Sequence, residues 1–334
     1  MPALAALDLG TNNCRLLVAR PQADCFEVID SFSRIVRLGE GLAASGWLKE
    51  RAMARTVAAL RVCARIMARH SVRQARCVAT EACRRALNGP EFLARVRRAT
   101  GIELEILAHE QEAQLALLGC LPLIEPGTGP ALLVDVGGGS TEILWLDRSA
   151  PADAGLVSIS LPVGVVALSE AFTSEPDEST FEAMVDHVRA GIEAVWGPCF
   201  GSRRPPAHLV GTSGTITTLA AFHLELRRYD RRRIDGLALD RAAVAGASER
   251  LRAMTNAERA AHPCIGPGRA DLVVAGCAIL EAVLRTWPAP ALRVADRGLR
   301  EGILHGLMGH TLEVALHERP ASGAPVPALH ATPA

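Results

Sequence analysis

The segment ALLVDVGGGSTEILWL, residues 131–146, consists of two apolar runs separated by a turn of glycine and small polar residues. The same arrangement occurs earlier in ALAALDLGTNNCRLLVAR, residues 3–20, where the turn again begins with an Asp-x-Gly sequence. An apolar run interrupted in this way is typical of a β-hairpin. The two copies lie too far apart for a solenoid repeat. They predict two related domains, each offering one polar turn to a shared cleft.

Strands and helices are expected to alternate in both halves of the chain, which predicts the α/β class. The alternating segment IELEIL, residues 102–107, is expected to be a strand, and HLVGTSGTITTLAAF, residues 208–222, a strand, a loop and a helix. Helical periodicity predicts helices over about 50–69, 90–101, 180–196, 269–287 and 298–317. Residues 319–334, rich in Pro, Ala and Gly, are expected to be disordered.

Composition excludes several classes of protein. The 334 residues carry 36 basic and 36 acidic side chains, so no net field recruits nucleic acid or a membrane surface. Lys49 is the only lysine, which excludes a catalytic lysine at any other position. Nine cysteines occur without a C-x-x-C pair, which argues against a zinc or thioredoxin-like centre. The start lacks the basic segment of a signal peptide, and we expect a cytoplasmic protein.

The turn DVGGGSTE, Asp135 to Glu142, has the composition of a phosphate and metal site. Three glycines allow backbone N–H groups to approach an anion closely, and Ser140 and Thr141 add hydroxyl groups. Two flanking carboxylates would repel a bare phosphate, so they indicate a magnesium ion between them and the phosphate oxygens. The alternative is a glycine-rich hairpin turn without a ligand. The first hairpin favours the ligand, because DLGTNNCR repeats Asp, Gly and hydroxyl and adds Arg15.

Other candidate residues are less specific. The loop GTSGTITT, 211–218, ends a strand and opens a helix, where anions bind, but it lacks the Gly-Lys-Ser of a Walker loop. Glu110 and Glu112 begin a helix and either stabilise its dipole or act catalytically. Arg84 is either a solvated charge or a phosphate clamp. The run RRYDRRR, 227–233, is either a solvated loop or an attractor of polyanions.

Nine segments in order resemble the exopolyphosphatase and guanosine pentaphosphate phosphohydrolase family, from about residue 3 to about residue 310. They are DLGTNNCRLLVA, RLGEGL, ATEACRRALNGPEF, EILAHEQEAQLALLG, DVGGGSTE, SLPVG, VGTSGTITTLAA, RADLVVAGCAILEAVL and DRGLREGIL. This family belongs to the actin and sugar-kinase superfamily of ribonuclease-H-like folds. The resemblance therefore implies two ribonuclease-H-like, actin-like domains with an interdomain cleft. Domain I is expected at 1–119, with the final helix at about 299–317 packed back onto it, and domain II at 120–298.

The resemblance also implies roles for individual residues. Glu112 would activate the attacking water, with Arg84 and Glu142 as further catalytic groups. Asp135, Glu142 and Asp8 would hold Mg²⁺, with or without a monovalent cation such as K⁺. Phosphate would be bound by three loops, comprising Gly10, Thr11, Asn12, Arg15, Gly137, Gly138, Gly139, Ser140, Thr141, Gly211, Ser213 and Gly214. Two departures occur: Ala108 and His109 replace the usual Ser-Gly, and Asp235 replaces a histidine, which weakens any inference about nucleotide recognition.

These features predict an exopolyphosphatase that releases terminal orthophosphate, with guanosine pentaphosphate as the alternative substrate. Longer relatives add helical domains that hold long polyphosphate, so short and medium chains are the expected substrates. A superfamily kinase or a non-catalytic polyphosphate or nucleotide sensor is the competing interpretation. Neither nucleic acid nor a membrane is an expected partner, and a homodimer is compatible with the sequence.

Overall fold

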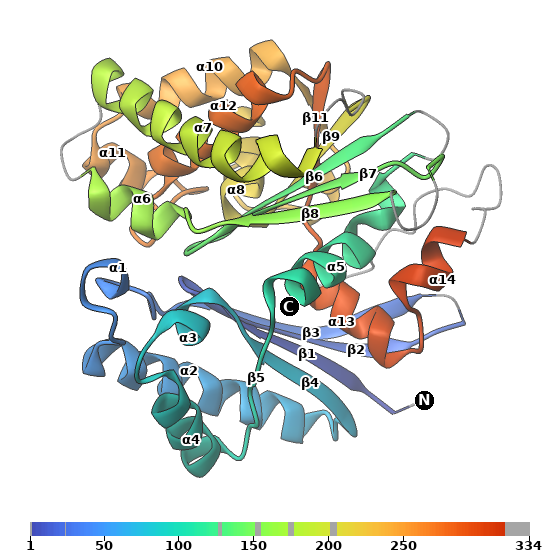
Figure 1. Cartoon of the computed structure of the whole chain (residues 1–334). Helices are drawn as coiled ribbons and strands as arrows, with labels where there is room; N and C mark the ends of the chain where they lie inside the picture. The colour runs from blue at the N-terminus through green and yellow to red at the C-terminus, as the bar shows by residue number, and fades with distance from the viewer. Residues whose placement is uncertain are drawn as a thin grey trace. The chain divides into compact units, whose positions relative to one another are not determined.

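The computed structural model describes residues 2–23, 25–125, 129–150, 155–172, 177–200 and 206–317, with the side chains of 197–200 left out. The chain divides into two compact units (Figure 1). Unit 1 comprises Met1–Leu121 and Gly298–Ala334, and unit 2 comprises Pro122–Arg297. The predicted disordered tail, 319–334, lies outside the described residues. The boundaries expected from the resemblance, domain I at 1–119 and domain II at 120–298, stay a prediction.

Unit 1 contains a five-stranded sheet in the order β3-β2-β1-β4-β5. The first three strands are antiparallel, and β4 and β5 continue the sheet in parallel from β1. Its strands are β1 Leu4–Leu9, β2 Asn13–Pro21, β3 Phe26–Ile35, β4 Gln74–Ala79 and β5 Glu105–Ile106. Its helices are α1 Leu42–Ser45, α2 Glu50–Arg69, α3 Glu81–Arg85, α4 Gly89–Thr100, α5 His109–Cys120, α13 Leu299–Leu307 and α14 Leu312–His317, with a 3₁₀ turn, η1, at Leu121–Leu123 after α5.

Unit 2 contains a six-stranded sheet in the order β10-β11-β9-β6-β7-β8. Its strands are β6 Ala131–Val136, β7 Thr141–Leu146, β8 Leu156–Leu161, β9 His208–Thr212, β10 Ala238–Asp240 and β11 Ala291–Ala295. Its helices are α6 Val165–Ala171, α7 Glu178–Phe200, α8 Ser213–His223, α9 Arg231–Ile234, α10 Arg241–Ala253, α11 Asn256–Ala261 and α12 Val273–Thr286.

The two sheets have the same topology, because β6, β7, β8, β9 and β11 take the places of β1 to β5 and only β10 is added. The turns of the two hairpins also match. Gly10 donates its N–H to the carbonyl of Asn13 at 2.9 Å, and Gly137 does the same to Ser140 at 3.0 Å. The repeat read from the sequence is therefore a repeat in structure, and the predicted α/β class is confirmed.

Side-chain alternation along the strands gives the unit 1 sheet two buried faces. Leu7 and Leu9 of β1 pack with α2 and α4 on one face. Leu4 and Ala6 point to the other face, where α13 covers them. Helix α13 lies against α5 so closely that a Cβ on Gly302 would come within 1.9 Å of the Leu115 carbonyl oxygen. Glycine is therefore required where these two helices meet.

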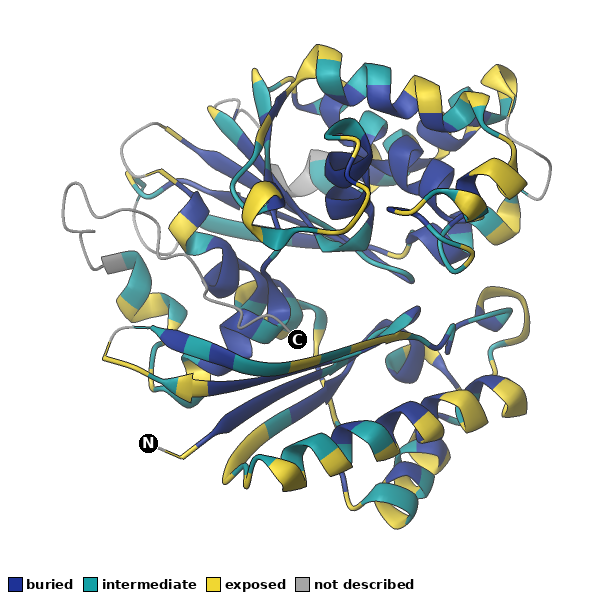
Figure 2. Ribbon diagram, turned by 180° about the vertical axis from the view of Figure 1, so that it is seen from behind, coloured by how far each residue is buried: buried dark blue, intermediate teal, exposed yellow. Residues whose placement is uncertain are grey.

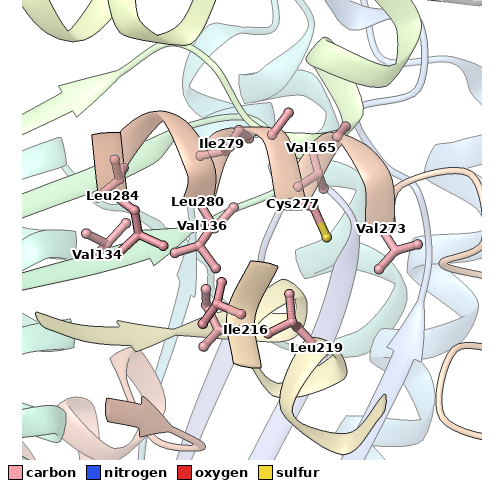
Figure 3. Close-up of a cluster of buried hydrophobic side chains, with 14 of the residues drawn as sticks. Val134, Val136, Val165, Ile216, Leu219, Val273, Cys277, Ile279, Leu280 and Leu284 are labelled. Atoms are coloured by element: carbon pink, nitrogen blue, oxygen red, sulfur yellow. The ribbon is translucent and has the colours of Figure 1, made fainter. Parts of the chain in front are cut away.

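The core of unit 2 lies between its sheet and the helices that cover it. Figure 3 shows Val134 and Val136 of β6 beside Ile216 and Leu219 of α8 and the apolar side chains of α12. Val134, Ile216 and Ile279 are fully buried. Figure 2 shows the same pattern throughout the described chain, with buried residues along the strands and exposed residues on the outer turns of the helices.

Several elements differ from their predicted extent. The single helix expected over 298–317 was wrong, because α13 ends at Leu307 and α14 begins at Leu312. Gly309 lies between them with φ +89°, a left-handed conformation that ends a helix. The strand expected over 102–107 is reduced to β5, and the helix expected from 269 begins at Val273.

Cysteines and hydropathy add two observations. The eight described cysteines are free thiols, and seven of them are buried. Among the described helices, none combines the length and the apolar character that a membrane span requires.

Candidate functional site

In unit 1, three polar segments follow the carboxyl ends of the parallel strands β1, β4 and β5. The first hairpin turn follows β1, α3 follows β4, and α5 follows β5. The backbone ties them together, because Thr80 donates to the Leu9 carbonyl at 3.1 Å and Leu107 to the Ala79 carbonyl at 3.0 Å. Ligands of open α/β sheets bind at this edge.

Arg84 of α3 connects these segments through its guanidinium group. Its Nη2 donates to Oε2 of Glu81 at 2.9 Å, and its Nη1 donates to Oε2 of Glu112 at 3.1 Å and to the Leu107 carbonyl at 2.5 Å. Only 16% of the Arg84 side chain is exposed, against 5% for Glu81 and 12% for Glu112. Arg84 is therefore an internal ion-pair partner that fixes the Glu112 carboxylate.

His109, at the first position of α5, lies beside the same arginine. Arg84 Nη2 is 3.0 Å from His109 Nδ1, and since the guanidinium can only donate, Nδ1 accepts and the ring proton is on Nε2. That nitrogen lies 3.7 Å from Glu81 Oε2. Glu110 is exposed, whereas Glu112 is half-buried and accepts a hydrogen bond from Arg84. The structure therefore distinguishes the two glutamates that the sequence left as alternatives.

The first hairpin turn contains polar atoms that the fold leaves without partners. Thr11 and Asn12 are buried, and Thr11 Oγ1, Asn12 Oδ1 and Asn13 Oδ1 have no hydrogen-bond partner among the described residues. Buried polar atoms are rarely left unpaired. Three in one turn are available to hydrogen-bond to water or to a ligand.

Asp8 and Arg15 face each other at the base of this turn, as opposite residues of β1 and β2. Burial raises the pKa of Asp8, and the positive charges of Arg15 and Arg300 oppose that increase. The Asp8 carboxylate is therefore already accompanied by positive charge within unit 1.

The second hairpin carries two carboxylates at the equivalent positions. Asp135 of β6 lies opposite Glu142 of β7, so both side chains project from the same face of the sheet. Glu142 is 2% exposed, and its Oε1 accepts from the hydroxyls of Ser140 at 2.7 Å and Ser160 at 3.0 Å. The Thr141 hydroxyl donates to the Val163 carbonyl at 2.7 Å. Both hydroxyls that the sequence suggested as phosphate donors thus donate within the protein.

The orientation of the glycine turn follows from its contacts with α6. Val165 and Val166 donate their N–H groups to the carbonyls of Gly137 and Gly138, at 3.0 and 2.9 Å. In a trans peptide the N–H points opposite to the C=O, so the N–H groups of the next residues, Gly138 and Gly139, point away from α6. Two adjacent N–H groups in a glycine turn form an anion-binding nest.

The third loop joins β9 to α8 and contains a strained residue. Ser213 has φ +84°, although it is not a glycine, and strain of this kind is concentrated at ligand sites. Gly214 follows it within the first turn of α8. Gly211 lies elsewhere, within β9 and buried, where a Cβ would come within 2.8 Å of Leu292 Cδ1. The structure therefore gives Gly211 a packing position in the sheet.

A family model described as the Ppx/GppA phosphatase family matches residues 17–311, which include the second hairpin, the third loop, α3 and α5. The chain belongs to the Ppx/GppA phosphatase family. Exopolyphosphatase 2 of Mycobacterium tuberculosis is 32% identical over 323 residues, covering 92% of this chain and 98% of that protein. A guanosine-5'-triphosphate,3'-diphosphate pyrophosphatase of Aeromonas salmonicida is 29% identical over 332 residues, covering 96% of this chain and 62% of its own length.

The crystal structure of the Aquifex aeolicus member of the Ppx/GppA family is similar to this chain with a TM-score of 0.75 and 30% identity. The match covers 92% of this chain and 97% of that one. The resemblance read from the nine segments, the actin-like two-domain fold class and the phosphatase class are therefore confirmed.

Asp235, where the resemblance led us to expect a histidine, has a structural role. It forms an ion pair with the buried Arg297 through both of its oxygens. It also accepts the backbone N–H of Asp296 at 3.0 Å. Asp235 therefore stabilises the end of β11, and its charge is neutralised within unit 2.

The fit of a divalent cation differs among the three carboxylates proposed to bind it. Asp135 and Glu142 are hard oxygen donors on one sheet face, which suits Mg²⁺. Like charges directly opposite each other destabilise a sheet unless a cation lies between them. Asp8 differs because Arg15 occupies the opposite position. The donor set of Asp135 and Glu142 thus fits a magnesium ion better than that of Asp8.

Sequence reasoning missed three residues that position the candidates. Glu81 shares Arg84 with Glu112, and Ser160 donates to Glu142 from a strand 18 residues further along. Gly164 packs its Cα against the glycine turn, where a Cβ would come within 2.4 Å of the Gly138 carbonyl carbon. All three lie in segments that carry the family resemblance, Glu81 in ATEACRRALNGPEF and Ser160 and Gly164 in SLPVG, but the segments alone do not show which side chains they contact.

Proposed function

We propose that this member of the Ppx/GppA family is an exopolyphosphatase that hydrolyses the terminal phosphoanhydride of inorganic polyphosphate. Guanosine pentaphosphate is the second candidate substrate, because its 5' end presents the same phosphoanhydride. The relatives named exopolyphosphatase and guanosine pentaphosphate pyrophosphatase support these two candidates. The observation that carries the proposal is the glycine turn between Asp135 and Glu142, which combines anion-binding N–H groups with paired carboxylates.

Unit 2 is proposed to bind the terminal phosphate. The N–H groups of Gly138 and Gly139 would donate to its oxygens, and the strained turn at Ser213 and Gly214 would add further backbone donors. Asp135 and Glu142 would hold Mg²⁺, which supplies charge neutralisation for the phosphoryl group. K⁺ as an additional ion stays a prediction.

Unit 1 is proposed to supply the base. Glu112 would accept a proton from water as the water oxygen forms a bond to the terminal phosphorus. The phosphoanhydride P–O bond breaks, orthophosphate leaves the chain end, and the shortened polyphosphate keeps the bridging oxygen. Arg84 holds Glu112 in a fixed position and balances its charge, so the base needs no rearrangement before it acts.

The test is phosphate release from short polyphosphate, long polyphosphate, guanosine pentaphosphate and ATP, measured side by side with Mg²⁺ and with EDTA. An exopolyphosphatase releases orthophosphate from polyphosphate without any acceptor. A kinase would consume ATP only when a sugar or carboxylic acid acceptor is present. A sensor would bind polyphosphate without releasing phosphate, and either result would contradict the proposal.

Three further features are part of the proposal. Short and medium chains are the expected substrates, the protein is expected to act in the cytoplasm, and a homodimer is the expected oligomer if one forms. Size-exclusion chromatography with light scattering tests the last of these.

A further inference from the structure

The unit 1 sheet ends in a long strand whose outer edge has no partner strand among the described residues. This strand, β3, is the outermost strand of its sheet (Figure 1). It has 10 residues, whereas the other edge strands of the two sheets, β5, β8 and β10, have 2, 6 and 3. The outer N–H and C=O groups of an edge strand can pair with a further strand. Strand β3 therefore offers the longest such edge in the part of the chain that the structure describes.

The sequence of β3, FEVIDSFSRI, does little to prevent such pairing. It contains neither lysine nor proline, the residues that commonly block edge-to-edge contacts. A bulge leaves Ile29 without a partner in β2, but the register is regular from Asp30 to Ile35. The part of the edge that can accept a further strand is therefore DSFSRI, residues 30–35.

The side chains of this regular part alternate between the two faces of the sheet. Asp30, Phe32 and Arg34 share one face. The Arg34 guanidinium lies over the Phe32 ring, 5.1 Å from its centroid. Ser31 and Ser33 are small and exposed and lie on the other face. Arg34 is itself exposed, and it forms no ion pair with any described residue, so its charge is available to a partner.

Asp30 supplies the opposite charge at the same edge. Its side chain is 21% exposed, lies 2.7 Å from His70 Nε2 and pairs with Arg69. It also accepts the backbone N–H of Ser31 at 2.8 Å. A carboxylate has about four acceptor positions, of which these contacts use three. Arg69 is 67% exposed, and ion pairs at the surface are weak, so a further guanidinium can share the Asp30 carboxylate.

Two copies of DSFSR, residues 30–34, complement each other when they run antiparallel with Phe32 at the centre. A two-fold axis perpendicular to the sheet then places Asp30 opposite Arg34 of the partner subunit and Ser31 opposite Ser33 of the partner subunit. A centre at Ser31 or Ser33 would leave both charges without an opposite charge across the strands. A centre at Asp30 or Arg34 would set like charges opposite each other, which destabilises a sheet.

We propose that β3 is a homodimer interface, in which the edges of two copies pair antiparallel around Phe32 and join the two five-stranded sheets of unit 1 into one. The occupant is a second copy of this chain, because the segment is complementary to itself in charge and in size. Main-chain hydrogen bonds hold the strands together, and Asp30 and Arg34 set the register. A strand-to-strand interface is small, so the dimer should form with a Kd of roughly 1–100 μM.

The first test measures the mass of the full chain by analytical ultracentrifugation over a range of protein concentrations. The wild type should pass from monomer to dimer as the concentration rises. Arg34→Glu sets a glutamate opposite Asp30 twice in the interface, and should raise the Kd of the dimer at least about tenfold. Arg98→Glu, the same charge change at an exposed arginine of α4, is the matched control and should dimerise like the wild type. Thermal unfolding checks that both variants are folded.

The second test examines the register without changing either charge. A mixture of Ser31→Cys and Ser33→Cys proteins should form a covalent dimer in oxidised glutathione, because these positions lie opposite each other. Neither variant alone should exceed the wild type. Two copies of one position would lie diagonally across the strands, about 7–8 Å apart, which a disulfide does not span.

Three results would overturn the proposal. A wild-type protein that remains monomeric above roughly 100 μM has no such interface. A dimer that Arg34→Glu leaves as tight as before is formed by another surface. Cross-linking of the single cysteine variants to the same extent as the mixture contradicts the register around Phe32, and this result decides the matter even if Arg34→Glu fails to fold.

Discussion

Asp135 and Glu142 lie directly opposite each other on neighbouring antiparallel strands, and Asp8 and Arg15 have the same relationship in the other hairpin. The repeated fold thus places opposite charges across the strands in one copy and two like charges in the other. Two carboxylates in such a position repel each other. A divalent cation bound between them would remove the repulsion, and for this reason we propose Asp135 and Glu142 as the Mg²⁺ ligands.

Asp135→Asn should raise the Mg²⁺ concentration needed for half-maximal phosphate release, because one charged oxygen ligand is lost. The variant should also show a smaller increase in Tm on addition of Mg²⁺, since a ligand stabilises the folded state according to its affinity. Asp186→Asn, an exposed carboxylate on α7 of the same unit, is the control and should behave as wild type. Equal wild-type activity in EDTA and in Mg²⁺ would refute the metal assignment.

Glu112→Gln should abolish phosphate release while polyphosphate binding is nearly unchanged, because the amide keeps the size of the side chain but cannot accept the proton. General-base catalysis typically contributes about 10²–10⁴-fold. Glu110→Gln, two residues away and exposed, should retain wild-type turnover. Residual turnover of the Glu112 variant above roughly a tenth of wild type would move the base to another carboxylate.

Arg84→Ala should lower kcat, because the Glu112 carboxylate loses its fixed partner. In a double-mutant cycle with Glu112→Gln, the two losses should be strongly non-additive, as expected for residues that act as one unit. Arg85→Ala, which removes a neighbouring guanidinium on α3 that is 42% exposed, should cost little. Additive losses would mean that Arg84 contacts the substrate independently of Glu112.

The preference for short and medium polyphosphate should appear as a plateau of kcat/KM per chain end with increasing chain length. The net charge of the protein is zero, so long polymers gain only through local arginines and screened, salt-sensitive attraction. A continuous rise from short oligomers to chains of hundreds of units at physiological salt would contradict this expectation.

Gly302→Ala should destabilise unit 1, since a Cβ there would lie 1.9 Å from the Leu115 carbonyl oxygen. Overpacking costs about 1–3 kcal/mol, and contact with rigid backbone places this case at the upper end. Gly306→Ala is the control in the same helix, because a Cβ there meets nothing within 4 Å. It should stabilise the helix by about 0.5–1 kcal/mol. Thermal unfolding of both variants tests this prediction. Equal Tm values for Gly302→Ala and Gly306→Ala would show that α13 shifts to accommodate the methyl group.

The hairpins, the glycine turns and the helix α2 were predictable from the sequence because their signals are local. The partners of single side chains were not. Arg84 was interpreted as a surface charge or a phosphate clamp, yet it pairs with Glu112, 28 residues away, because β4 and β5 are neighbours in the sheet. Ser160 reaches Glu142 only through the register of β7 and β8. The break between α13 and α14 was missed because apolar periodicity continues across Gly309.

The chain leaves unit 1 at Leu121 and returns to it at Gly298, so unit 2 is an insertion within unit 1. A ribosome therefore releases all of unit 2 before it releases α13, which covers the second face of the unit 1 sheet. Domains fold as they emerge from the ribosome, so unit 1, whose synthesis starts first, is completed after unit 2. Until residue 307 has emerged, α13 cannot cover Leu4 and Ala6, and this apolar face of the sheet stays exposed on the nascent chain.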